Sequence, residues 1–144
     1  MDFLTLRGDA ARAHTASDVV VAGEWAFVSN VLPIDLDNDR TPLPEYIEEQ
    51  TLTVLANLER LLVRIGATRR DVVSVRVSLT NFDKMFPRFE RVYEGFFAPG
   101  HLPARSCVGV TPACGRAMIH THQKSGLFNF DWPPSTAGSK AIGR

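Results

Sequence analysis

The residues whose types most clearly suggest chemistry lie in the stretch Leu102–Val110, Leu-Pro-Ala-Arg-Ser-Cys-Val-Gly-Val. Apolar residues alternate with polar or small ones after the proline, which predicts a β-strand. In such a strand Arg105, Cys107 and Gly109 point to one face and the residues between them to the other. A guanidinium beside a thiol and a glycine can hold a carboxylate through two parallel hydrogen bonds. The alternative is a surface arginine that closes the edge of a sheet.

Two histidines near the C-terminal end, His120 and His122, could act on a proton or a metal ion. An imidazole with a pKa of about 6.5 can serve as a general base near neutral pH. The His-x-His spacing places both rings on one face of a strand, a possible metal-binding arrangement, but no third ligand is evident. We therefore expect no metal. Cys107 could be a nucleophile only if a neighbouring charge ionised its thiol, and a small apolar core residue is the simpler interpretation.

The composition favours one soluble globular domain. Of the 144 residues, 44% are hydrophobic and 22% are charged, which is enough for a single buried core. Lys and Arg number 16, as do Asp and Glu, so nothing indicates a nucleic-acid-binding surface. No apolar run approaches the roughly 20 residues of a membrane span, and the start of the chain lacks a signal-peptide pattern. Cys107 and Cys114 form no disulfide framework, so free thiols in a cytoplasmic protein are expected.

The first half of the chain predicts three strands and a long helix. A short strand over 2–7 precedes a hairpin whose strands, 18–22 and 25–29, are joined by Gly23 and Glu24. An exposed loop over 31–41 leads to apolar residues at helical spacing from Ile47 to Ile65, and Gly66 ends this amphipathic helix. Gln50 and Asn57 lie seven residues apart on one helix edge, where we expect them to bond the backbone of a neighbouring loop.

The second half predicts a strand, a second helix and a hairpin. Residues 72–79 alternate cleanly, with one fully apolar face, and an aromatic stripe from Phe82 to Phe97 predicts a helix that buries this stripe in the core. The strand 105–110 then turns back into a strand over 117–122. From Lys124 onward no periodicity is evident. We expect residues 1–123 to form one domain and 124–144 a partly disordered extension.

These elements predict an α+β fold with a mixed sheet of five to six strands and two helices on one face. Two helices cannot cover both faces of such a sheet, and apolar residues remain for the second face. Subunit association would bury them, so we expect a closed symmetric homo-oligomer.

The ordered set of motifs resembles the Rid (YjgF-like) enamine/imine deaminase superfamily over roughly residues 15–123. The matching motifs, in chain order, are Val21-Ala22-Gly23, Phe27-Val28-Ser29, Gln50-Thr51, Val54-Leu55, Asn57-Leu58, Ala67, Asp71-Val72-Val73, Val92-Tyr93, Phe96-Phe97 and Pro103-Ala104-Arg105-Ser106. The resemblance implies a chorismate-mutase-like fold, assembled as a trimer with clefts between subunits. It also implies that Arg105 holds a substrate carboxylate in such a cleft, that backbone near Cys107 lines it, and that no cofactor is needed.

Several site positions depart from the family pattern. His120 stands where active deaminases carry a last-strand glutamate, about fifteen residues past the arginine. Ser17 lies in Ala-Ser-Asp where the family has Tyr-Ser-Gln, and Ser29 begins Ser-Asn-Val where Ser-Gly-Gln is frequent. Glu90 replaces a common asparagine of the second helix and could orient His120 or share its proton. The candidate substrate-binding residues are Arg105, Cys107, Ser17, Glu90 and Ser29, and the candidate catalytic residues are Arg105 and His120.

Three functions remain open from the sequence. The first is a hydrolytic deaminase of enamine or imine carboxylates, which would release a 2-oxo acid and ammonia. The second is a non-catalytic trimer that binds a small carboxylate in the same cleft. The third, RNA cleavage, is attributed to some relatives, but the zero net charge and the absence of a basic, aromatic groove argue against it. We expect no nucleic-acid or membrane partner.

Overall fold

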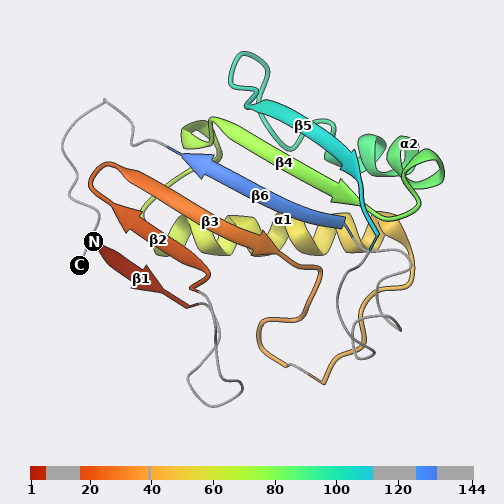
Figure 1. Ribbon diagram of the computed structural model, residues 1–144, viewed down its shortest axis with the longest axis horizontal. Helices are drawn as coiled ribbons and strands as arrows, with labels where there is room; N and C mark the ends of the chain where they lie inside the picture. The colour runs from red at the N-terminus through yellow and green to blue at the C-terminus, as the bar shows by residue number, and fades with distance from the viewer. Residues whose placement is uncertain (6–16, 39, 112–125, 133–144) are drawn as a thin grey trace.

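The computed structural model describes residues 1–5, 17–38, 40–111 and 126–132, the last range as backbone only. Three strands precede the first helix, and helices and strands then alternate as far as β5 (Figure 1). In chain order they are β1 (Asp2–Leu4), β2 (Val19–Ala22), β3 (Trp25–Val31), α1 (Ile47–Arg64), a 3₁₀ turn η1 (Arg69–Asp71), β4 (Ser74–Leu79), α2 (Phe82–Tyr93), β5 (Ala104–Gly109) and β6 (Gly126–Trp132).

The described strands form one mixed six-stranded sheet in the order β1-β2-β3-β6-β4-β5. The predicted hairpin is confirmed, since Ala22 pairs with Trp25 and Gly23 takes a φ of 60° in the tight turn between them. Strands β4 and β5 run parallel, with α2 as the crossover between them. Strand β5 therefore lies at the edge of the sheet, among the elements that the structure describes.

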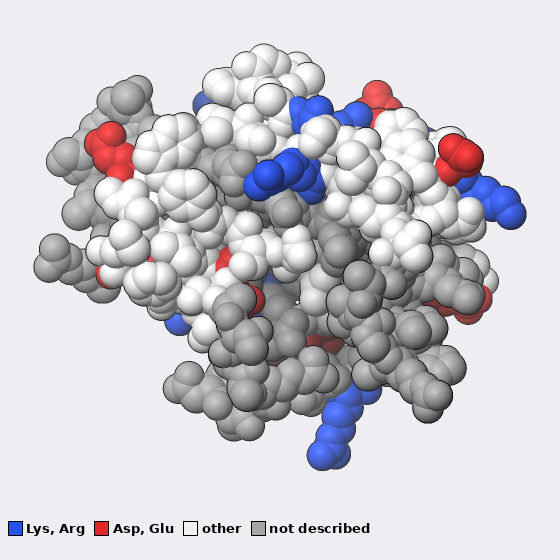
Figure 2. All heavy atoms as spheres, viewed as in Figure 1, with Lys and Arg blue, Asp and Glu red and all other residues white. Residues whose placement is uncertain are grey.

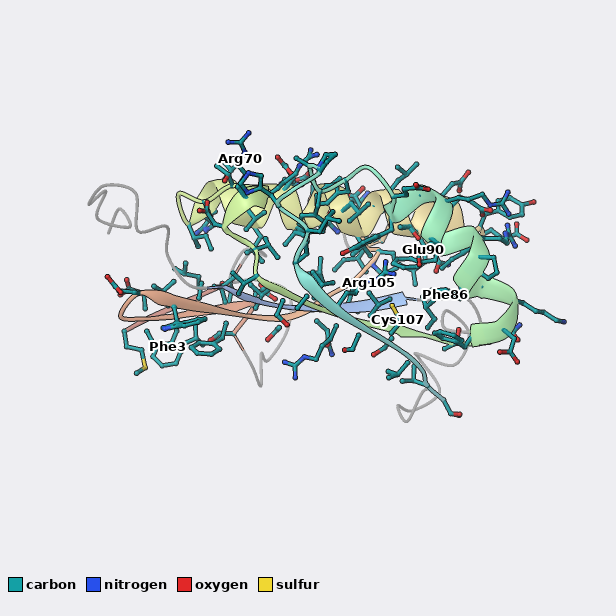
Figure 3. The ribbon with its side chains drawn as sticks, turned by 90° about the horizontal axis from the view of Figure 1, so that it is seen from above. Phe3, Arg70, Phe86, Glu90, Arg105 and Cys107 are labelled. Carbon is teal, nitrogen blue, oxygen red and sulfur yellow. The ribbon has the colours of Figure 1, made fainter. Side chains whose placement is uncertain are left out.

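Both helices lie on the same face of the sheet, as a view along the sheet shows (Figure 3). The apolar side of β4 packs against the helices. Its residues Val75, Val77 and Leu79 therefore have no accessible surface. Val54 and Leu58 of α1 are equally inaccessible in this core. The predicted α+β class is thus confirmed, with a hydrophobic layer between sheet and helices.

Helix α1 starts and ends as the sequence predicted. It begins at Ile47 and gives way to Gly66, whose φ of 76° closes the helix in the left-handed conformation that glycine adopts easily. Gln50 donates to the carbonyl of Pro44 at 2.7 Å. Asn57 donates to the carbonyls of both Leu32 and Ile34 at 2.9 Å. The predicted role of these two amides, bonding loop backbone, is confirmed.

Helix α2 carries the predicted aromatic stripe into the core. Phe89 is fully buried and Tyr93 is 8% exposed, and their ring centroids lie 5.2 Å apart. Stacked, tilted or edge-to-face aromatic pairs run from one end of the stripe to the other, namely Phe82–Phe86, Phe86–Phe89, Phe89–Tyr93, Tyr93–Phe97 and Phe96–Phe97. The stripe is core, and it holds α2 over the β4–β5 edge.

The prediction that the chain lacks regular structure from Lys124 onward is wrong for 126–132. This segment forms β6, which pairs antiparallel with β3 on one side and β4 on the other. The physical reason lies in the sequence Phe128-Asn-Phe-Asp-Trp132, in which aromatic and polar residues alternate with the period of two that is typical of a strand. The strand predicted over 117–122 lies outside the described residues.

The second face of the sheet meets none of the described helices (Figure 3). Several large apolar side chains are exposed, among them Phe3 at 64%, Phe27 at 49% and Val108 at 50%. Seen from this side, most of the described surface is neither acidic nor basic (Figure 2). In the described part of the chain, no helix is long and apolar enough to cross a bilayer.

Candidate functional site

Arg105 lies near the start of β5 and points to the helix-covered face. The parallel register pairs Val75 with Arg105 and Val77 with Cys107, so both residues share the face of the buried β4 valines. Gly109 follows on this face at a point where an added Cβ would lie 3.1 Å from Cβ of Phe82. A side chain at this position would press on Phe82 at the start of α2, so glycine fits the close approach of helix and strand. The predicted facing of Arg105, Cys107 and Gly109 is confirmed.

Arg105 is held by a bidentate ion pair with Glu90 of α2. Nη1 donates to Oε1 at 2.8 Å and Nη2 to Oε2 at 2.9 Å. The side chain of Arg105 keeps 26% of its accessible surface and that of Glu90 keeps 36%, so the pair is half-buried between α2 and the sheet edge (Figure 3). The bond to Glu90 raises the pKa of Arg105, which stays fully charged.

Tyr93 supports the same guanidinium from one side. The Arg105 Cζ atom lies 4.7 Å from the centroid of the Tyr93 ring, a cation–π geometry. Glu90 and Tyr93 are three residues apart on α2, so one helix face supplies both contacts. Burial raises the pKa of the Tyr93 hydroxyl to about 12, and the Arg105 charge opposes this shift.

Cys107 is a half-buried free thiol that packs against the hydrophobic core. Burial raises its pKa, and the nearby Arg105 charge opposes this shift. A raised pKa disfavours the thiolate at neutral pH, so Cys107 fits a core-packing residue better than a nucleophile.

Ser17 and Ser29 lie together, but away from Arg105. The Ser29 hydroxyl donates to the Ser17 carbonyl at 2.7 Å. Val28, next to Ser29, pairs with a residue of β6, which pairs with Val75 of β4, which in turn pairs with Arg105. Val28 and Arg105 are thus three strand spacings, or roughly 14 Å, apart. A small pocket adjoins this second group; it is lined by Asp18, Ser29, Asn30, Val31, Leu32, Ile34, Leu36, Asn57 and Leu61. One chain thus carries two separate halves of the predicted site.

His120, the predicted catalytic residue, lies outside the described residues, as do His122 and Cys114. Its predicted proximity to Glu90 therefore stays a prediction. In the described part of the chain no group of three or more His, Cys, Asp or Glu side chains is placed to hold a metal ion.

The aromatic spacing of α2 places Tyr93 in the core alone, and the family pattern pairs Glu90 with His120. The structure adds that both contact Arg105. The signal that could have found them is their i, i+3 spacing on the crossover helix between β4 and β5, since such a helix must pack beside the strand that follows it.

Comparison with known proteins identifies the family of this arrangement. The Endoribonuclease L-PSP family model matches residues 9–118. A RutC family protein of Saccharolobus solfataricus is 35% identical over 95 residues, which cover 66% of this chain and 73% of that protein. The chain belongs to the Rid (YjgF-like) superfamily.

Further members of the Rid superfamily agree in sequence and in fold. Protein MMF1 of Saccharomyces cerevisiae, a mitochondrial protein, is 34% identical over 98 residues, which cover 68% of this chain and 65% of MMF1. The crystal structure of a putative endoribonuclease from Thermotoga maritima superposes with a TM-score of 0.73 at 30% identity. The superposition covers 94% of this chain and 99% of the Thermotoga maritima chain.

Proposed function

We propose that this Rid-family chain is a hydrolytic deaminase of enamine or imine carboxylates, with Arg105 as the carboxylate anchor. The observation that carries the proposal is the guanidinium of Arg105, half-buried at a sheet edge and supported by Glu90 and Tyr93. A charge-assisted, bidentate contact from such a fixed arginine both binds and orients a planar carboxylate. Family membership supports the same role.

The chemistry needs little from the protein beyond orientation and one proton carrier. An enamine first takes a proton at carbon and becomes the imine. Water then adds to the imine carbon, the nitrogen gains protons and leaves as ammonia, and the C–N bond is replaced by the carbonyl of a 2-oxo acid. We assign the proton transfer from water to His120, whose imidazole is a suitable base at neutral pH.

We further propose that the complete cleft forms between subunits of a homotrimer. Val28, the neighbour of Ser29 in β3, lies three strand spacings or roughly 14 Å from Arg105 within one chain, too far for Ser29 and Arg105 to contact the same small molecule. A neighbouring subunit could supply the second half, and the exposed apolar face of the sheet offers the surface for association.

The anchoring role is tested by replacing Arg105. Arg105→Ala should lower kcat/KM for ammonia release from enzymatically generated 2-aminoacrylate by roughly 10- to 150-fold, the equivalent of roughly 1.5–3 kcal/mol. Arg70→Ala is the matched control, because Arg70 is exposed in η1, and should turn over at the wild-type rate. Equal ammonia release by Arg105→Ala and wild type would contradict the proposal.

The alternative is a non-catalytic trimer that binds a small carboxylate. It is favoured by one observation, that both carboxylate oxygens of Glu90 accept hydrogen bonds from Arg105, which makes this carboxylate a poor proton acceptor for catalysis. Calorimetry decides between the two, because a binding protein would take up a carboxylate in an Arg105-dependent manner while showing no turnover of any imine. The third function, RNA cleavage, would be excluded if the RNA-cleaving activity of a preparation disappeared on further purification.

A further inference from the structure

The ion pair between Glu90 and Arg105 influences which ligand charges the site can bind. A guanidinium has five N–H donors, and the pair with Glu90 uses one on Nη1 and one on Nη2. The donors left include the edge formed by Nε and the second Nη2 hydrogen, which is itself a two-pronged carboxylate site. Arg105 can therefore hold a second carboxylate without releasing Glu90.

The net charge of this site, however, is not that of a lone arginine. The Glu90 carboxylate already neutralises the guanidinium at 2.8–2.9 Å, in a half-buried setting where charges are only partly screened. A ligand that carries only a negative charge meets the attraction of Arg105 and the repulsion of Glu90 together. A ligand that carries a positive group next to its carboxylate can match both residues.

On the proposed function, we infer that Glu90 makes the Arg105 site selective for zwitterionic carboxylates, in which a cationic nitrogen stands beside the carboxylate. The carboxylate lies along the Nε–Nη2 edge of Arg105 and the cationic nitrogen faces the Glu90 carboxylate. A protonated imine carboxylate has this charge pattern. The 2-oxo acid produced from it has lost the nitrogen and is a simple anion, so Glu90 favours binding of the substrate and release of the product.

Glu90 is a specificity residue in this arrangement, and Tyr93 fixes the pair it forms. The ring lies against one face of the guanidinium, with Cζ 4.7 Å from the ring centroid, and this contact fixes the plane in which the edges of Arg105 lie. Because Glu90 occupies one edge of the guanidinium, a ligand carboxylate on the adjacent edge lies beside Glu90 in the guanidinium plane. This places the Glu90 carboxylate next to whatever group the bound carboxylate carries on its α-carbon.

The test compares two ligands with one carbon skeleton, 2-aminobutanoate, which is a zwitterion at pH 7.5, and 2-oxobutanoate, which is an anion. Calorimetric titrations of the full-length protein should show wild type binding the amino acid at least tenfold tighter than the oxo acid. Glu90→Gln, which keeps the side-chain shape and removes the charge, should bind the oxo acid at least tenfold tighter than wild type does, so that the preference is lost or reversed. Glu94→Gln, one turn further along and exposed, should keep the wild-type preference.

The outcomes separate the inference from the proposed function. Equal preference in wild type and Glu90→Gln, with binding lost in Arg105→Ala, would overturn the selectivity of Glu90 and leave the carboxylate anchor intact. Binding of neither ligand by wild type or Glu90→Gln would overturn both. Thermal unfolding of Glu90→Gln serves as the folding check, and Glu90→Asp, which keeps the charge, should restore the preference for the amino acid if the first variant is unstable.

Discussion

At the scale of single residues, Arg105 shows how a flexible side chain is made ready to bind. Glu90 lies in the plane of its guanidinium and Tyr93 against the face, so both the position and the rotation of the group are constrained. A free arginine loses up to about 2 kcal/mol of rotamer entropy when it is ordered. Because folding has already ordered Arg105, a ligand does not meet this cost when it binds.

The pKa of Tyr93 predicts a pH dependence of stability. Burial raises this pKa from 10.0 to about 12 in the folded protein, while the unfolded chain loses the proton near pH 10. The protonated phenol thus favours the folded state, and its contribution is complete below pH 10 and is lost as the pH rises toward 12. Urea unfolding between pH 8 and 11.5 should show a steeper loss of the free energy of unfolding in wild type than in Tyr93→Phe. Tyr46→Phe, at an exposed position, should follow wild type; parallel curves for all three would contradict the prediction.

At the scale of elements, α1 does more than cover the sheet, because its amides also organise the loop that follows β3. Asn57 holds the carbonyls of Leu32 and Ile34, and these three residues line the pocket beside Ser29. Gln50 holds the carbonyl of Pro44 just before the helix begins. The loop between β3 and α1 is therefore attached to the helix at both of its ends, next to one half of the candidate site.

Asn57→Ala should lower the free energy of unfolding by about 1–3 kcal/mol, since it leaves two loop carbonyls without their donor. Chemical denaturation measures this loss. Glu49→Ala, an exposed change in the same helix, should stay within about 0.5 kcal/mol of wild type. A change for Asn57→Ala no larger than that of this control would show that the loop does not depend on the amide.

How far the sequence alone predicts these elements depends on the range of the interactions that form them. The hairpin at Gly23, the bounds of α1 and the bonding of Gln50 and Asn57 follow from spacing within one segment, and the structure confirms them. The segment of β6 does alternate with period two from Phe128 to Trp132, but this pattern is short, and the place of the strand in the sheet is set by pairing with β3 and β4, which lie far away in the chain. The Glu90–Arg105 pair forms only once α2 crosses over the sheet edge, so the i, i+3 spacing of Glu90 and Tyr93 indicates a shared helix face but not which residue it contacts.

At the scale of the whole molecule, the two faces of the sheet differ in what covers them. One face is buried under α1 and α2, while the other presents apolar side chains to solvent in the single chain. On this second face Phe3 pairs with Val20, and Val20 with Phe27, so the three form a row across β1, β2 and β3. Rows of apolar residues on a sheet face are typical of surfaces that associate.

The row of Phe3, Val20 and Phe27 leads to a prediction about assembly. Wild type should sediment at three times the 15.9 kDa of one chain, and Phe27→Glu should shift it toward a single chain, because association would bury an unpaired carboxylate. Val63→Glu introduces the same charge at a 70% exposed position of α1 and should leave the mass unchanged. Since the proposed cleft combines Ser29 of one subunit with Arg105 of another, Phe27→Glu should also lose ammonia release, although neither residue is altered. A folded, monomeric Phe27→Glu protein with full activity would show that the complete site lies within one chain.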